Sequence, residues 1–277
     1  MKKILALILA VLMVFTMVAC GNTATETTET TETADSDLAY VTENGKLTVG
    51  ITIYDPMNYY DENGELTGFD TEYAQAVCEK MGLEANFVEI NWDTKEVELE
   101  AKSIDCIWNG MTITEERAAN MSISDPYVKN AQVIVVLADS GIASTADLIG
   151  KTVVAEMGSA GEAQIVGEDA NADLAQAEYV GMAKQTDCLM EVKAGTADAA
   201  VLDWTLAMSM VGEGTDFADL MIVDGVELAT EEYGIAFRKG SDITAAVNAA
   251  TAELVADGTL PALAEKYGLA LAPAIAG

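Results

Sequence analysis

Short apolar runs typical of β-strands alternate with segments of helical periodicity over most of this chain. The first strand is expected at 47–51, and the first helix is expected to begin at Asp70 as its N-cap and to end at Gly82. Further strands are expected at 84–90, 103–108, 131–138, 151–155 and 199–202, and further helices at 95–101, 161–167, 186–194, 242–256 and 259–267. Because strands and helices alternate in this way in helix-covered parallel sheets, the pattern predicts an α/β fold built on parallel strands.

A weak internal repeat predicts two lobes of similar construction. Residues 98–112 and 190–204 share the order of a helix, a lysine, an aspartate and an apolar strand. In open α/β sheets, ligands bind outside the carboxyl ends of the strands. Gly110, Thr112 and Asp203 fall at such ends and are therefore candidate ligand-binding residues.

The N-terminus has the pattern of an export signal. Lys2 and Lys3 precede an apolar segment, 4–18, that is too short to span a membrane, and small residues then lead to Cys20. This pattern predicts a signal peptide at 1–19 and lipidation of Cys20 after cleavage. The alternative is ordinary cleavage beside an incidental cysteine.

Residues 22–37 are rich in threonine and acidic residues and contain no large apolar side chain, so this segment cannot bury enough surface to fold. We expect residues 20–44 to form a disordered tether between the lipid and a folded protein. No later stretch of the sequence is long and apolar enough to cross a bilayer.

Composition excludes several classes of function. The formal net charge of −32 leaves no basic surface for nucleic acid. The absence of histidine excludes Ser-His-Asp and Cys-His catalysis and the commonest zinc sites, although carboxylate-based catalysis stays open. We expect no metal and no cofactor. Cys78, Cys106 and Cys188 cannot all pair internally because their number is odd, and we expect them to be small buried hydrophobic residues; whether all three are free does not follow from the sequence.

Arg117 is one of only two arginines in a chain with 46 acidic residues. It ends the run 109–117 (Asn-Gly-Met-Thr-Ile-Thr-Glu-Glu-Arg) and falls in the expected first turn of a helix, where a cation is electrostatically misplaced. An external anion held by the guanidinium and by free backbone N–H groups would account for this arrangement. A small carboxylate ligand is the natural candidate, and a surface ion pair with a neighbouring acid is the alternative.

A set of short motifs in a fixed order resembles the solute-binding proteins of bacterial ABC transporters for polar amino acids, extracellular solute-binding protein family 3. The motifs are Leu-Thr-Gly-Phe-Asp at 66–70, Gly-Met-Thr-Ile-Thr-Glu-Glu-Arg at 110–117, Ser-Asp-Pro-Tyr at 124–127, Lys-Thr-Val-Val at 151–154, Ala-Ala-Val-Leu-Asp at 199–203, Tyr-Gly-Ile-Ala-Phe-Arg-Lys at 233–239 and Ala-Asp-Gly-Thr at 256–259. The resemblance implies a type II clamshell of two α/β lobes joined by two hinge strands. Lobe 1 would comprise residues 45–130 and 233–277, and lobe 2 residues 131–232.

The resemblance also implies a division of roles around an interlobe cleft. Arg117 and the backbone N–H of Thr112 would bind the α-carboxylate of the ligand, and Asp203 with the carbonyl of Gly110 would bind its α-ammonium group. The remaining positions that match the family's ligand-contacting residues are Tyr54, Trp92, Met111, Glu156, Met157, Gly158 and Ala160.

Two positions depart from the family pattern, and several residues have a purely structural alternative. Ala160 replaces a threonine whose hydroxyl helps to bind the carboxylate in many relatives. The segment 51–54 near the first strand lacks the acid that contacts basic ligands in some relatives, which argues against, without excluding, a specificity for lysine, arginine or histidine. Asp203 could instead cap a helix, and Trp92 and Tyr54 could be packing residues. Glu156 could select a polar or basic side chain or could face solvent.

The sequence therefore predicts a lipid-anchored, extracytoplasmic, monomeric receptor that delivers a polar amino acid to an ABC permease and performs no chemistry. Which amino acid binds does not follow from the sequence. A dehydratase of the same fold that acts on cyclohexadienyl substrates such as arogenate is one alternative, with Glu156 as the candidate proton donor. A ligand-sensing receptor module is another.

Overall fold

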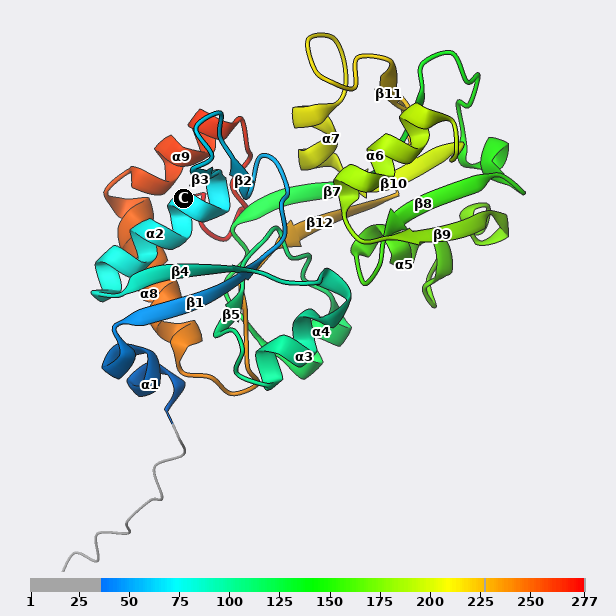
Figure 1. Cartoon of the computed structure of the whole chain (residues 1–277). Helices are drawn as coiled ribbons and strands as arrows, with labels where there is room; N and C mark the ends of the chain where they lie inside the picture. The colour runs from blue at the N-terminus through cyan, green and yellow to red at the C-terminus, as the bar shows by residue number, and fades with distance from the viewer. Residues whose placement is uncertain (1–35, 227, 277) are drawn as a thin grey trace, which may run out of the picture. The chain divides into compact units, whose positions relative to one another are not determined.

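The computed structural model describes residues 36–226 and 228–276 (Figure 1). The expected signal peptide, the lipidation site at Cys20 and the tether up to residue 35 lie outside the described residues. Helix α1 spans Asp37–Asn44, so the fold begins eight residues before the boundary that we expected from the sequence. The helix forms because the Ser36 side chain accepts a hydrogen bond from the backbone N–H of Ala39 and Gly45 ends the helix in a left-handed conformation.

The first sheet contains five strands in the order β4-β1-β5-β13-β6. Their bounds are β1 Lys46–Ile51, β4 Glu84–Glu89, β5 Cys106–Ile107, β6 Ser122–Ile123 and β13 Ala236–Phe237. Strand β1 pairs in parallel with β4 and β5, as the alternating pattern predicts, but β13 is antiparallel to β5 and β6. The antiparallel strand arises because the chain returns to this sheet near its C-terminal end. We call the part built on this sheet lobe 1.

Helices α2 (Phe69–Met81), α8 (Ile243–Ala256) and α9 (Thr259–Tyr267) pack against one another in lobe 1 (Figure 1). Helices α3 (Lys95–Glu100) and α4 (Glu115–Asn120) contact β5 and β6, respectively. The predicted N-cap role of Asp70 is wrong, because Gly68 occupies that position and the Asp70 side chain is buried in the lobe. The remaining small elements of this lobe are the hairpin of β2 (Tyr59–Tyr60) with β3 (Leu66–Thr67) and the 3-10 turn η1 (Trp92–Thr94).

The second sheet contains six strands, in the order β11-β7-β10-β8-β9 with β12 also paired to β7. Their bounds are β7 Val128–Leu137, β8 Thr152–Glu156, β9 Glu178–Met182, β10 Ala199–Asp203, β11 Leu220–Ile222 and β12 Ala229–Tyr233. Strand β8 is parallel to β9 and β10, whereas β7 is antiparallel to β10, β11 and β12. We call this part lobe 2. Its other elements are α5 (Ala160–Val166), α6 (Gln185–Ala194), α7 (Trp204–Met210) and the 3-10 turns η2 (Thr145–Leu148) and η3 (Leu174–Gln176).

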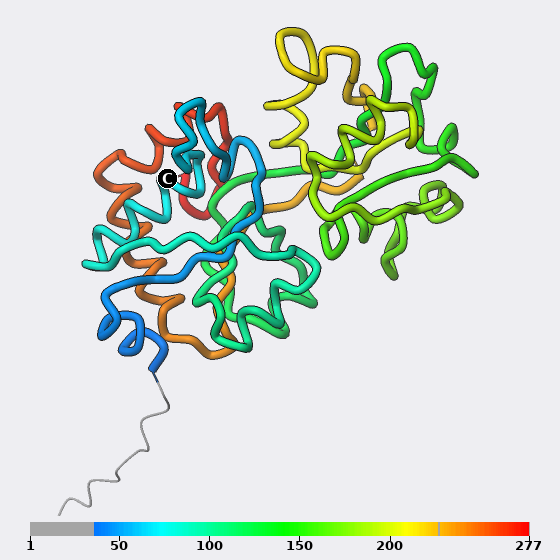
Figure 2. The backbone as a smooth tube through the Cα atoms, viewed as in Figure 1, coloured from blue at the N-terminus to red at the C-terminus, as the bar shows by residue number. Residues whose placement is uncertain are grey.

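Two strands carry the chain between the sheets. Strands β7 and β12 pair from Val128–Tyr233 to Gln132–Ala229, and the backbone trace passes through both of them (Figure 2). The lobe boundaries expected after residues 130 and 232 fall inside these strands. Because β10 and β8 end at Asp203 and Glu156, the carboxyl ends of two parallel strands place two carboxyl groups at one edge of the second sheet.

The three cysteines at 78, 106 and 188 are buried, as predicted, and all three are free, which the sequence left open. No helix in the described part of the chain combines the length and the apolar composition that crossing a membrane requires.

Candidate ligand-binding site

Arg117 lies on α4, whose N-cap is Thr114. The Thr114 Oγ1 accepts a hydrogen bond of 3.1 Å from the backbone N–H of Arg117. The guanidinium group is buried, and its Nη1 donates to the carbonyl of Thr112 (2.8 Å) and its Nη2 to the carbonyl of Gly158 (3.0 Å). Burial lowers the pKa of Arg117. Arg117 is therefore a buried cation bonded to neutral carbonyls, and the alternative of an exposed surface ion pair is wrong.

Lys95, the first residue of α3, is a second buried cation that the sequence did not suggest. Its Nζ donates to the carbonyls of Trp92 (3.1 Å) and Gly158 (2.9 Å) and lies 4.9 Å from the centre of the Trp92 ring. Burial, and then the positive charge of Arg117, lower the pKa of Lys95 to about 8. The carbonyl of Gly158, on lobe 2, thus accepts hydrogen bonds from two cations of lobe 1.

Asp203 ends β10 and is buried among amide groups. Its Oδ1 accepts hydrogen bonds of 2.6 Å from Asn130 Nδ2 and from Gln132 Nε2, and its Oδ2 accepts one from Gln185 Nε2. Burial raises the pKa of Asp203. Although Asp203 occupies the N-cap position of α7, its side chain makes no capping hydrogen bond, so capping does not account for this residue.

Glu231, on β12, shares the amide donors of Asp203. Its Oε1 accepts hydrogen bonds from Asn130 Nδ2 (2.5 Å), Gln132 Nε2 (2.8 Å) and Thr112 Oγ1 (3.0 Å). Burial, and then the charge of Asp203, raise the pKa of Glu231 to about 7. Sequence reasoning missed Glu231, because nothing in its spacing distinguishes it among 46 acidic residues.

Glu156 ends β8, and its side chain is 4% exposed. Its Oε1 is buried and has no hydrogen-bond partner in the described residues. Burial, and then the charge of Asp203, raise the pKa of Glu156 to about 8. The alternative in which Glu156 faces solvent is therefore wrong.

Gly110 takes a left-handed conformation (φ 56°) between two tyrosine rings, and a Cβ atom there would lie 2.7 Å from Tyr54 Cε1. The Tyr54 hydroxyl is 2.6 Å from that of Tyr233 and also contacts Thr205 Oγ1 of lobe 2. The backbone N–H of Gly110 donates to Asp70 Oδ2 (2.7 Å). Asp70, whose pKa burial raises to about 7, therefore fixes the backbone of this bend rather than capping a helix.

Arg117, Asp203, Glu156, Gly110 and Tyr54 line one small cavity of about 10 Å³, whereas Lys95, Glu231 and Asp70 do not. Its lining residues are Tyr54, Trp92, Asn109, Gly110, Thr112, Arg117, Glu156, Ser159, Ala160, Gln185 and Asp203. A neighbouring cavity of about 500 Å³ shares Arg117, Ser159 and Ala160 and adds Lys95 and Gly158.

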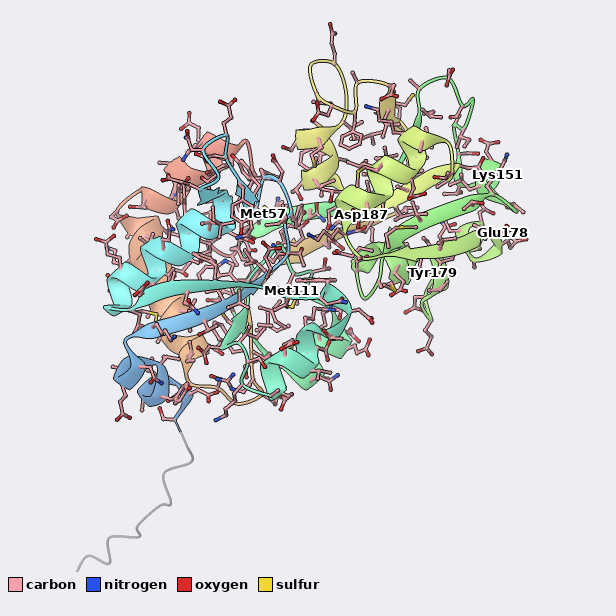
Figure 3. All side chains as sticks on the ribbon, viewed as in Figure 1. Met57, Met111, Lys151, Glu178, Tyr179 and Asp187 are labelled. Carbon is pink, nitrogen blue, oxygen red and sulfur yellow. The ribbon has the colours of Figure 1, made fainter. Side chains whose placement is uncertain are left out.

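Of the predicted site residues, Met111 and Met157 are not part of the small cavity's lining, and Gly158 belongs to the neighbouring one. The Met111 side chain packs in an apolar cluster with Trp92 and Leu99 of lobe 1 (Figure 3). Met157 donates its backbone N–H to the carbonyl of Met182 (2.9 Å) and lies against Gly181.

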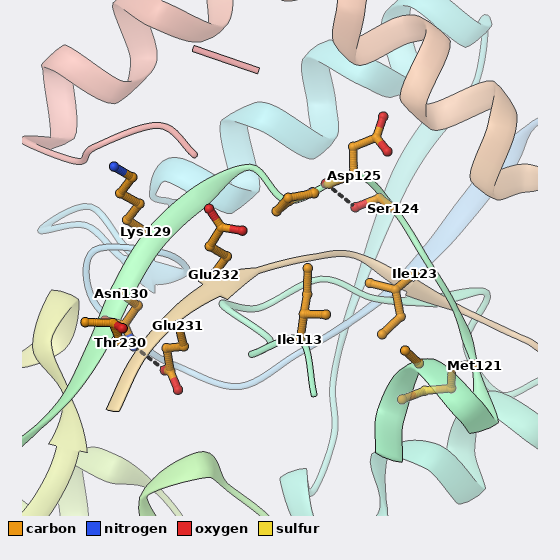
Figure 4. A pocket seen from close by; sticks show the side chains of 12 residues that line it. Ile113, Met121, Ile123, Ser124, Asp125, Lys129, Asn130, Thr230, Glu231 and Glu232 are labelled. Atoms are coloured by element: carbon orange, nitrogen blue, oxygen red, sulfur yellow. Dashed lines mark hydrogen bonds between the residues drawn. The ribbon is translucent and has the colours of Figure 1, made fainter. Parts of the chain in front are cut away.

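A larger pocket of about 970 Å³ lies on the hinge strands (Figure 4). Asn130 and Glu231 reach it from β7 and β12, and the hydrogen bond between them is drawn in the figure. Its other charged lining residues are Asp125, Lys129 and Glu232, and neither Arg117 nor Asp203 lines it. The small cavity is the better candidate for a charged ligand because its lining brings Arg117 and Asp203 together.

A two-lobed α/β fold with a charged cavity at its strand ends is the architecture of extracytoplasmic solute-binding proteins. The chain belongs to the bacterial extracellular solute-binding proteins, family 3, whose family model matches residues 47–270. The predicted family and fold class are thereby confirmed.

Three similar proteins illustrate this family. The L-cystine-binding protein TcyJ of Escherichia coli (strain K12) is 33% identical over 82% of this chain and 84% of its own length. The arginine-binding extracellular protein ArtP of Bacillus subtilis (strain 168) is 31% identical over 96% of this chain and 98% of its own. The crystal structure of a mutant of ArgBP from T. maritima superposes with a TM-score of 0.76 and 36% identity, covering 84% of this chain and 99% of that one. These relatives are named as binding proteins rather than as enzymes.

Proposed function

We propose that this protein captures a free polar amino acid in the small cavity and delivers it, chemically unchanged, to an ABC permease. The observation that carries the proposal is the pairing of Arg117 and Asp203 in one cavity lining. The hydrogen-bond partners of Arg117 are carbonyls and those of Asp203 are amides, so neither charge is neutralised by these contacts. An amino acid supplies a carboxylate for the first and an ammonium group for the second, which offsets the cost of burying both charges.

The proposed contacts follow from this division of charge. Arg117 and the N–H of Thr112 bind the α-carboxylate. Asp203 binds the α-ammonium group with the Gly110 carbonyl, and Glu231 supports Asp203 through their shared amide donors. Tyr54 and Trp92 flank the ligand from lobe 1, and Ser159 and Ala160 border it from lobe 2.

Ligand capture requires the lobes to part. A cavity of about 10 Å³ holds no more than about one water molecule, and an amino acid has several times as many heavy atoms. The hydrogen bonds of Arg117 and Lys95 to the Gly158 carbonyl join lobe 1 to lobe 2 in this conformation. An opening at the hinge strands would release these bonds, and a ligand held by both lobes would favour their closure around it.

We further propose that lipidation of Cys20 holds the protein outside the cell membrane as a monomer, with residues 20–36 as its tether. The family consists of extracellular solute-binding proteins, which supports the location. A Cys20→Ser variant should then appear in the soluble fraction, whereas the natural protein should sediment with membranes.

The binding proposal is tested by a thermal-unfolding screen of the pure protein against the twenty amino acids and cystine, followed by calorimetry on each positive. A ligand at 100 times its dissociation constant stabilises the folded state by about 2.7 kcal/mol, which raises the unfolding midpoint measurably. We expect a narrow set of polar amino acids to do so. If no amino acid shifts the midpoint or produces heat, the proposal is wrong.

A further inference from the structure

When both of its lining acids are ionised, the small cavity carries one negative charge more than Arg117 and a neutral amino acid can balance. The lining contains one cation, Arg117, and two acids, Glu156 and Asp203. In the proposed function, on which this inference rests, the ligand's α-carboxylate matches Arg117 and its α-ammonium group matches Asp203. Glu156 is then the remaining lining acid, and a zwitterion offers it no charge.

No cation of the protein neutralises Glu156; in the unliganded protein burial favours its protonated form, since its pKa is raised to about 8, and a cationic ligand group would displace that proton. The charged groups that affect it are Asp203, Asp187, Lys95 and Lys184, two of each sign. Lys95 directs its Nζ to the carbonyls of Trp92 and Gly158, and Lys184 lies 4.0 Å from Glu89. No ion pair within 4.0 Å involves Glu156 in the part of the chain that the structure describes, and its Oε1 lacks a hydrogen-bond partner there.

A buried carboxyl oxygen without a partner is costly, because the group has lost its water and gained nothing in return. Packing does not account for its presence, since glutamine or methionine would fill the same volume without a titratable group. A positively charged ligand group next to Glu156 would offset that cost and make the total charge of ligand and lining residues zero.

We propose that Glu156 is the specificity-determining residue for the ligand's side chain, and that the ligand is an amino acid with a cationic side chain. Glu156 binds the guanidinium or ammonium group at the end of that side chain. Glu156 would thus serve as the recognition acid from lobe 2, in a chain whose segment 51–54, at the end of the first strand, carries no acid.

The test compares ligands of equal shape and different charge. Arginine and citrulline are nearly isosteric, but only arginine is cationic at its end. Lysine and ornithine test ammonium groups, and glutamine tests a neutral side chain. The variant is Glu156→Gln. Its matched control is Glu178→Gln, which removes the same charge from an exposed position on the neighbouring strand β9 of the same lobe (Figure 3).

By calorimetry we expect the natural protein to bind arginine, lysine or ornithine with at least about 30-fold higher affinity than citrulline or glutamine. This is the difference expected when a buried charge gains an ionic partner. Glu156→Gln should remove most of this preference by weakening the cationic ligands, while citrulline affinity changes less than about threefold. Glu178→Gln should preserve the preference. Urea unfolding of the unliganded Glu156→Gln protein should show no loss of stability, which separates a role in recognition from one in folding.

The inference is overturned if citrulline or glutamine binds the natural protein as tightly as arginine, lysine and ornithine do. A uniform loss of affinity for every ligand in Glu156→Gln would also overturn it, since Glu156 would then support the site as a whole. Failure of every amino acid to bind the natural protein would instead refute the proposed function.

Discussion

Glu231 and Asp203 are two acids that share two amide donors, and this arrangement makes stability depend on pH in a predictable direction. The pKa of Glu231 is raised from 4.5 to about 7 by burial and by Asp203. Between about pH 4.5 and pH 7, the Glu231 carboxyl is protonated in the folded protein but has lost its proton in the unfolded chain. The protonated carboxyl therefore favours the fold below pH 4.5, and this contribution disappears as the pH rises through about 7.

The perturbation is Glu231→Gln. A pKa of about 7 in place of 4.5 corresponds to roughly 3 kcal/mol, which is an upper limit because Asp203 relaxes when its neighbour changes. The glutamine carbonyl can accept the same hydrogen bonds from Asn130, Gln132 and Thr112. We therefore expect the unliganded variant to be more stable than the natural protein by about 1–3 kcal/mol at pH 8 and by close to zero at pH 4.5.

The assay is urea unfolding of both proteins without ligand at several pH values from 4.5 to 8. Calorimetry at pH 6.5 in buffers with different ionisation enthalpies provides a second readout. An ammonium group placed at this pair should displace a proton, and Glu231→Gln should reduce that release and weaken binding. A variant that is less stable than the natural protein at pH 8, or a difference that does not grow with pH, would refute the reasoning.

Three further substitutions test the site. Arg117→Lys keeps the positive charge but loses the planar guanidinium, which can bond the Thr112 carbonyl and a ligand carboxylate at the same time. Calorimetry should therefore show about 10- to 100-fold weaker ligand binding. Unchanged affinity would count against a role for Arg117 in binding the carboxylate. Asp203→Asn should weaken ligand binding by at least about 30-fold. It should not lower the thermal-unfolding midpoint of the unliganded protein, because burial, which raises the pKa of Asp203, already disfavours its charged form. A large fall in that midpoint would indicate a structural role for Asp203 instead. Gly110→Ala should cost about 1–3 kcal/mol in urea unfolding, since its φ is 56° and the new Cβ would lie 2.7 Å from the Tyr54 ring; a neutral result would contradict this packing.

The parts of the fold that could be predicted are those fixed by local pattern. Strands such as β1 and β10 are apolar runs of ordinary length, and helices such as α9 end at a glycine that the sequence displays. The antiparallel strand β13 could not be predicted from alternation, because its two residues pair with β5 and β6 from far earlier in the chain. Local pattern therefore predicted the elements better than their pairing.

The site divides in the same way. Arg117 was predictable because arginine is rare in this chain and its position at a helix start is unfavourable without an anion. Lys95 and Glu231 were not, since a lysine on a helix and an acid on a strand are usually exposed, and only the tertiary fold buries Lys95 and partly buries Glu231. The predicted site residue Met111 packs its side chain in the core of lobe 1 and does not line the small cavity, so its place in the ligand site stays a prediction.

Asp203 and Glu231 also link the proposed ligand to the hinge strands. Asn130 and Gln132 lie on β7 and Glu231 lies on β12, the two strands that connect the lobes, and Thr112 donates to Glu231 from lobe 1. An ammonium group that binds Asp203 changes the charge seen by this whole network, so the ligand would alter the strength of hydrogen bonds within the hinge as well as those across the cavity. A ligand can shift a conformational equilibrium only through such differences in affinity between its states. The network around Glu231 therefore provides a route by which ligand charge, in addition to ligand shape, would favour closure.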